Sequence, residues 1–251
     1  MSSVEISLLV FTLVFGGALF GMRLSPYISA SELKEDTKLH VRTGVGLLTS
    51  MFALLLSLQL SSAKTTFDVQ EQDVTLLASK AMMLDRVLAH YGPEAQKARE
   101  SLRDNIIDLL NHVWPMERSE LSTWTPENTN GIEVYNKIQE LSPKDENQSS
   151  ERTLALGMAI DLGQMRWASA SRVRSSTAIP LFIVEITWVT VIFATFGLLA
   201  PRNAIVVISL AVCALAVSGG FFLIVEMNTP FSGLLHASSA PIREALKYLA
   251  R

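Results

Sequence analysis

The sequence predicts an all-α membrane protein with four transmembrane helices and a helical soluble domain inserted between the second and third spans. Apolar residues make up 49% of the 251 residues, and they are gathered into four blocks rather than spread along the chain. One stretch, Thr43–Tyr91, continues from an apolar block into an amphipathic pattern without a break. No stretch shows the strict alternation of apolar and polar residues that is typical of strands.

Four segments are apolar enough to span a bilayer, and only the third contains a charged residue, Glu185. The segments are Ile6–Met22, Gly44–Leu60, Ala178–Ala200 and Ala204–Val225. We expect the first to be a retained span and not a signal peptide. The reason is that Met1–Glu5 contains no Lys or Arg, and no small-residue cleavage site follows the apolar run.

The second span is predicted to continue as one helix into the soluble domain, because Leu47–Tyr91 contains neither Gly nor Pro. Its later part has apolar residues at a period of 3.6, which indicates one buried face. They are Val74, Leu77, Ala78, Ala81, Leu84, Leu88 and Tyr91. A loop with a short helix at Ser31–Lys38 is expected before it. Gly92-Pro93 then predicts a tight turn into an antiparallel helix at Pro93–Val113.

Two further helices are predicted in the soluble domain, a short one at Ile132–Leu141 and one after the polar stretch Ser142–Ser150, which we expect to be mobile. The last one is expected to turn Leu154, Met158, Leu162, Met165 and Trp167 inward and to reach the third span through Arg166, Arg172 and Arg174. The last two spans form a hairpin, and small residues such as Ala214, Ser218 and Gly220 permit close helix approach in the fourth. A terminal amphipathic helix follows Ser239.

The chain therefore divides into four parts. Residues 1–60 form the first two transmembrane helices and their loop, 61–177 the helical soluble domain, 178–227 the transmembrane hairpin, and 228–251 the C-terminal turn and amphipathic helix. Four spans place both termini and the soluble domain on one side. Basic residues are nearly balanced between the two sides, and we expect the domain to be cytoplasmic.

Composition excludes several classes of function. A net charge of −3 gives no sign of nucleic-acid binding. The single cysteine and the four scattered histidines do not form a metal-ligating pattern, so no metal and no cofactor are expected. No nucleophile elbow, phosphate loop or HExxH motif is present, so the protein is not expected to be an enzyme. The group of Asp85, Arg86 and His90 is interpreted as a salt-bridge cluster.

A stripe of small and polar residues follows one face of the long helix, at about 100° per residue. The stripe comprises Gly46, Ser50, Ala53, Ser57, Ser61, Lys64, Asp68 and Glu71. It predicts either a close helix–helix contact or the lining of a water-filled pore in a symmetric oligomer. A constriction would then come from the flanking Leu56 or Leu60. Glu185 is the intramembrane acid, with a structural and a functional interpretation of equal weight.

Three stretches together resemble one family. They are LDRVLAHYGPEAQKARESLRDNIIDLLNHVWP at Leu84–Pro115, LIVEMNTPFSGLLHASSAPIREAL at Leu223–Leu246, and GVGLLTSMFALLLSLQLSSAKTTFD in the second span. The chain is similar to the bestrophin-like domain family of bacterial integral membrane proteins, which was long listed as a domain of unknown function. The family is distantly similar in layout to the bestrophins, which are pentameric anion channels with a pore lined by the second span.

The resemblance implies an oligomeric, channel-like protein, a pentamer that conducts anions such as chloride, with the second helix lining the pore. The alternative is a non-conducting membrane scaffold or sensor whose soluble helices bind a partner. The expected partners are membrane lipid, copies of the same chain and inorganic ions, and no nucleic acid. The expected location is the bacterial inner membrane.

Overall fold

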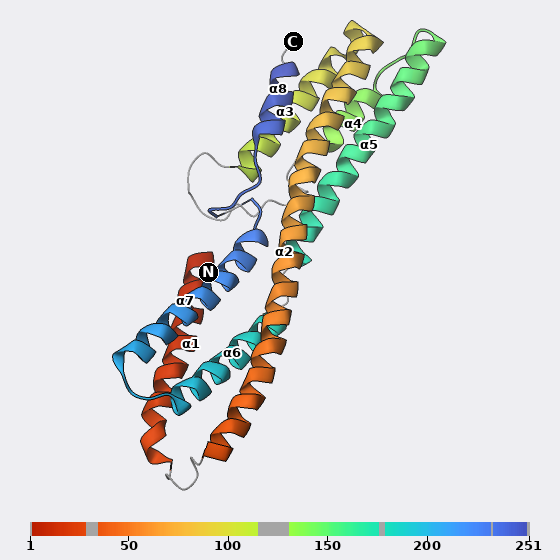
Figure 1. Ribbon diagram of the computed structural model, residues 1–251. Helices are drawn as coiled ribbons and strands as arrows, with labels where there is room; N and C mark the ends of the chain where they lie inside the picture. Colours follow the sequence, from red (N-terminus) through yellow and green to blue (C-terminus); the bar gives the residue numbers. More distant parts are fainter. Residues whose placement is uncertain (1, 29–34, 115–130, 176–178, 232, 250–251) are drawn as a thin grey trace. The chain divides into compact units, whose positions relative to one another are not determined.

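The computed structural model describes residues 2–28, 35–114, 131–175, 179–231 and 233–249, and every regular element within these ranges is a helix. The described residues form two compact units (Figure 1). Unit 1 comprises Met1–Thr66 and Thr177–Thr229, and unit 2 comprises Phe67–Ser176 and Pro230–Arg251. Each unit is described by itself below.

Four helices in the described part of the chain are long and apolar enough to cross a membrane. They are α1 (Ser3–Leu24), α2 (Glu35–Tyr91), α6 (Ile179–Leu199) and α7 (Ala204–Met227). The prediction of an all-helical fold with four candidate membrane spans is thereby confirmed for the described residues. Composition explains why these helices qualify as spans. In the apolar segment of each helix, most side chains are apolar and only a few are buried within the protein itself.

Helix α2 is a single helix of 57 residues and begins at Glu35, earlier than the predicted start at Thr43 (Figure 1). The prediction assigned the polar residues before Thr43 to a loop. Those residues still favour a helix, because Glu35 and Asp36 lie at its N-terminal end, where acidic side chains are stabilising, and Lys38 pairs with Glu35 at 2.9 Å. The first residues of the short helix predicted at Ser31–Lys38 lie outside the described residues.

In unit 1, α1 packs against α6 with the two backbones nearly in contact. A Cβ atom built on Gly21 would lie 1.9 Å from the carbonyl oxygen of Ala194, and one built on Gly197 would lie 1.9 Å from that of Ala18. The sequence Gly17-x-x-x-Gly21 explains the approach, since two glycines one turn apart remove the side chains that would separate the helices.

The small residues of α7 contribute less to close packing than predicted. Ala214 and Ser218 are buried, and the Ser7 hydroxyl of α1 donates to the Ser218 carbonyl at 3.1 Å. A Cβ atom on Gly220 would make only ordinary contact with Leu56, and one on Gly219 would meet open space. The tightest glycine-mediated contact in the described part of unit 1 is therefore between α1 and α6.

In unit 2, the apolar face predicted for the second part of α2 is buried in full. It forms one core with the apolar faces of α3 (Gln96–Val113) and α8 (Ala240–Tyr248). The turn between α2 and α3 contains Gly92 at φ +120°, a conformation that other residues rarely adopt. The short 3-10 helix Pro93–Ala95 leads from it into α3.

The α2–α3 hairpin is closed by a two-pronged ion pair. Asp85 and Arg99 lie at equal sequence distances from Gly92, so the antiparallel arrangement brings them together. Arg99 Nε donates to one Asp85 oxygen at 2.7 Å and Nη2 to the other at 2.9 Å. His90 pairs with Glu151 on α5 (Glu146–Ser175). The interpretation of Asp85 and His90 as salt-bridge residues agrees with these contacts.

Several predictions for the region around α4 (Gly131–Gln139) and α5 were wrong. Leu154 and Trp167 are exposed instead of inward, because the buried face of α5 is centred on Ala155 and Leu162. Arg166 is 8% exposed, so it is a buried group rather than a surface charge near the membrane. The side chains of Arg172 and Arg174 lie outside the described residues.

Part of the polar stretch Ser142–Ser150, which was expected to be mobile, forms the first turn of α5 and makes hydrogen bonds. Gln148 donates to the Tyr91 carbonyl at 3.0 Å and accepts from the Lys144 backbone at 2.8 Å. Lys144 pairs with Glu94 after the turn, and this hydrogen bond lowers the pKa of the Glu94 carboxyl. The polar residues of this stretch therefore form contacts between helices.

Candidate functional site

The predicted stripe on α2 is a free surface of the protomer. Seven of its eight residues are exposed, and Asp68 is half-buried. The exposed members are Gly46, Ser50, Ala53, Ser57, Ser61, Lys64 and Glu71. A Cβ atom built on Gly46 would meet nothing within 4 Å. The described helices therefore leave most of this face open, although Ala53 and Ser57 also border a cavity lined by residues of α6 and α7.

The opposite side of the helix carries the packing. Phe52 is 5% exposed, and its ring lies 6.5 Å from that of Phe221 on α7. Val45 and Ala63 are also buried. Since the bulky side chains of this face are directed into unit 1, the small and hydroxylated side chains are left on the outside of the protomer.

The exposed part of α2 in the membrane has a second sector beside the stripe. It consists of large apolar side chains that repeat at the same spacing one residue further along the chain: Leu47, Met51, Leu54 and Leu58. Each is at least 47% exposed, as expected for contact with lipid. The two sectors differ sharply in chemistry although both are open, which argues against lipid as the partner of the stripe.

Hydroxyl groups on the helix are satisfied locally. Ser50 Oγ donates to the Gly46 carbonyl at 3.1 Å, and Thr65 Oγ1 donates to the Ser61 carbonyl at 3.0 Å. A hydroxyl bound in this way keeps its lone pairs for another partner, such as water or a group on a neighbouring subunit. The aqueous end of the stripe is charged, with Lys64 and Asp68 as i,i+4 neighbours followed by Glu71.

The predicted constriction residues lie at the edge of an apolar cavity of about 350 Å³ in unit 1. Leu56 and Leu60 line it together with Ala53 and Ser57 of the stripe, and Phe193 and Val217 form part of its far wall. Leu56 also packs against the core of unit 1. The two leucines are therefore flanking residues, and the stripe itself presents no bulky side chain.

Glu185 is fully buried inside unit 1, at 0% exposure. Neither of its carboxyl oxygens has a hydrogen-bond partner among the described residues, and the same holds for Nε2 of Gln59. The Gln59 amide, on α2, is the polar group that interacts with the Glu185 carboxyl, although the two do not form a hydrogen bond of standard geometry. An acid in a membrane helix is expected to face the bundle interior, and Glu185 does so.

Within the described residues, no three or more His, Cys, Asp or Glu side chains are grouped as a metal site would require. Cys213 is exposed on α7. Sequence reasoning missed two features, the Gly17/Gly21 contact with α6 and a buried Arg166–Asn105 pair in unit 2. The first could have been found from its GxxxG spacing. The second carries no sequence signal, because Arg166 resembles the basic residues that follow it.

The helical architecture comprises four candidate membrane spans, and one of them, α2, carries an exposed face of small and polar residues. A family model described as the Bestrophin-like domain matches residues 12–242. The chain belongs to this family, as its motifs predicted, and membership suggests a channel-like membrane protein.

One solved structure, described as the crystal structure of a membrane protein, is similar over 97% of both chains, with a TM-score of 0.65 and 12% sequence identity. At that identity the likeness shows the fold alone. No curated protein matches the sequence.

Proposed function

We propose that the protein is an ion channel-like oligomer in which copies of α2 surround a water-filled path. In this proposal the four candidate spans cross the bacterial inner membrane, and the helices between the second and third spans form a cytoplasmic soluble domain. The observation that carries it is the exposure of the stripe beside an equally exposed sector of large apolar residues. Lipid suits the second sector, whereas the small and hydroxylated residues suit water.

The proposed path along the exposed stripe of α2 requires a symmetric ring of subunits. One protomer cannot enclose a path with a single face of one helix, so copies of the stripe must meet around an axis. The family's distant similarity in layout to the bestrophins, which are pentameric anion channels, supports five subunits and a preference for anions. The proposed function contains no catalytic step and needs no cofactor.

A non-conducting scaffold or sensor is the second candidate. It is favoured by exposed large apolar residues on the helices of unit 2, among them Leu76 and Met83 on α2 and Trp167 on α5. Such residues suit a protein partner or a neighbouring subunit. A scaffold predicts that the ring, or a dimer, is dry along the stripe.

Recording from the purified protein in planar bilayers under a KCl gradient separates the two. The channel proposal predicts currents that reverse near the chloride equilibrium potential. Ala53→Phe and Ser57→Phe place a ring of bulky side chains on the path and are expected to reduce the single-channel current by about half or more. Leu54→Phe and Leu58→Phe are matched controls in the neighbouring sector and should leave it unchanged. Silence at all voltages, or equal effects in both sectors, would contradict the proposal.

A further inference from the structure

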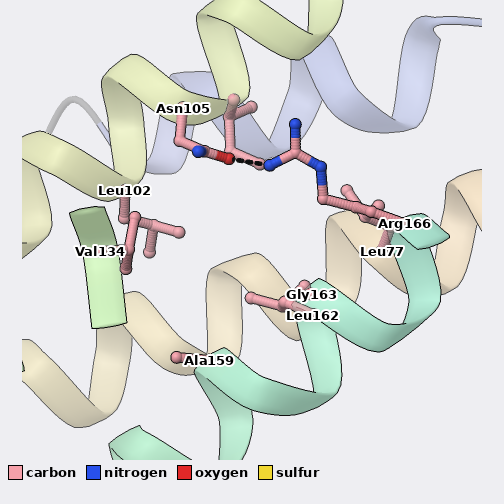
Figure 2. Close-up of a pocket in the computed structure, with 9 residues that line it drawn as sticks. Leu77, Leu102, Asn105, Val134, Ala159, Leu162, Gly163 and Arg166 are labelled. Atoms are coloured by element: carbon pink, nitrogen blue, oxygen red, sulfur yellow. Dashed lines mark hydrogen bonds between the residues drawn. The ribbon is translucent and has the colours of Figure 1, made fainter. Parts of the chain in front are cut away.

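A small cavity in unit 2 is walled by apolar side chains and by two buried polar ones (Figure 2). Arg166 reaches from α5 toward Asn105 on α3, while Leu77, Val134 and Leu162 form part of the apolar wall. Arg166 is 8% exposed and Asn105 is 5% exposed. Buried polar groups of this kind normally have all their hydrogen bonds satisfied.

Two donor groups in this cavity lack acceptors. One guanidinium nitrogen of Arg166, Nη1, donates to the amide oxygen of Asn105. The other, Nη2, has no acceptor among the described residues, and neither has Nδ2 of Asn105. Both nitrogens can only donate, because neither a guanidinium nitrogen nor an amide NH2 group accepts hydrogen bonds. A single ligand that satisfies both nitrogens has to accept a hydrogen bond from each of them.

The charge at the site is positive at neutral pH. Burial lowers the pKa of Arg166 to about 10, which still leaves it protonated there. Asp108, almost one helical turn beyond Asn105 on α3, acts on Arg166 through its charge, but it does not supply the missing acceptor for Nη2. A buried cation with an unused N–H favours a negatively charged acceptor over a neutral one.

The size of the cavity limits the ligand to a single atom or a small molecule. Its volume is about 30 Å³. One water needs about 10–15 Å³ on the same measure, so the space admits one monatomic ion or one to two waters. Sulfate and phosphate, with four oxygens each, exceed the one or two waters that this space admits. Among common anions, a halide meets the requirements of charge, acceptor chemistry and size.

We propose that the cavity between α3 and α5 binds one chloride ion, held by Arg166 Nη2 and Asn105 Nδ2. The bound ion joins the two helices and completes the hydrogen bonding of two buried side chains. It lies in unit 2 and does not depend on conduction along the α2 stripe. The site is therefore a structural anion site of the helical core, distinct from the proposed path for ions.

Thermal unfolding of the full-length protein in detergent tests the site, with sodium chloride titrated against sodium gluconate at constant ionic strength. The melting midpoint of the wild type is expected to rise with chloride and then saturate, because a ligand that binds only the folded state stabilises it. Asn105→Leu and Arg166→Met should lose this dependence. Lys80→Met, which removes an exposed ion pair with Asp161 in the same unit, should keep it. A chloride dependence that persists unchanged in both site variants would overturn the proposal.

Diffraction from wild-type crystals grown in sodium bromide decides the question without any variant. The expected result is a bromide anomalous peak within hydrogen-bond distance of Arg166 Nη2 and Asn105 Nδ2. Density for water at that place with no anomalous signal would overturn the proposal. This readout also covers the case in which the site variants fail to fold, and it is independent of whether the protein passes current.

Discussion

Gly21→Ala is expected to prevent native packing of α1 against α6. The added Cβ atom would lie 1.9 Å from the Ala194 carbonyl oxygen and 2.8 Å from its carbon, both of them backbone atoms that cannot rotate away. The helices would have to separate along the whole Gly17–Gly21 contact, which costs about 3 kcal/mol or more. Gly197→Ala should have the same effect from the other side, since its Cβ atom would meet the Ala18 carbonyl. The measurement is thermal unfolding of each purified variant in detergent.

Gly16→Ala is the matched control. It lies on the same helix, gains the same helix propensity, and its Cβ atom would meet nothing within 4 Å. This variant is expected to match or slightly exceed the stability of the wild type. Equal melting temperatures for Gly16→Ala and Gly21→Ala would show that α1 and α6 do not approach each other as closely as the structure places them.

Arg99→Ala is expected to give the largest loss of stability in unit 2. The Asp85 side chain is 12% exposed and accepts both of its hydrogen bonds from Arg99, so truncation leaves a nearly buried carboxylate without its partner. The hydrogen bond to Asp85 raises the pKa of Arg99, so the guanidinium keeps its charge across the accessible pH range. The expected loss is about 3 kcal/mol, or a fall of about 6–12 °C in melting temperature for a chain of this size.

Lys80→Ala provides the comparison for this second prediction. It removes an ion pair with Asp161 at 3.0 Å whose acidic side chain is 56% exposed. Exposed pairs contribute at most about 1 kcal/mol, so the melting temperature should change by no more than about 3 °C. Similar losses for Arg99→Ala and Lys80→Ala would contradict the distinction between a buried and an exposed pair.

Periodicity was sufficient to predict most of the fold. The spacing from Val74 to Tyr91 identified the buried face of α2, and the Gly92-Pro93 pair identified the turn. These signals are local, because each depends on residues within one helix or one turn. The predictions for Leu154 and Trp167 failed because α5 has a mixed pattern, in which only packing against neighbouring helices such as α4 selects the buried side.

The candidate functional site was harder to predict from the sequence than the fold. The stripe could be located on α2, but its exposure depends on where α6 and α7 pack, as the burial of Phe52 against Phe221 shows. The Arg166–Asn105 pair joins two residues that are 61 positions apart in the sequence, and no local pattern connects them. Contacts of this kind are determined by tertiary structure, since each residue alone is typical of a solvated helix surface.

The central claim, that water lies along the α2 stripe, is tested most directly by cysteine labelling in proteoliposomes. Ser57→Cys and Leu58→Cys, each in a Cys213→Ser background, differ by one residue and therefore by about 100° around the helix. A membrane-impermeant, charged thiol reagent is expected to modify Ser57→Cys and to leave Leu58→Cys unmodified, as measured by intact mass. Absence of labelling at Ser57→Cys, or equal labelling of the two variants, would contradict a water-filled path on this face of α2.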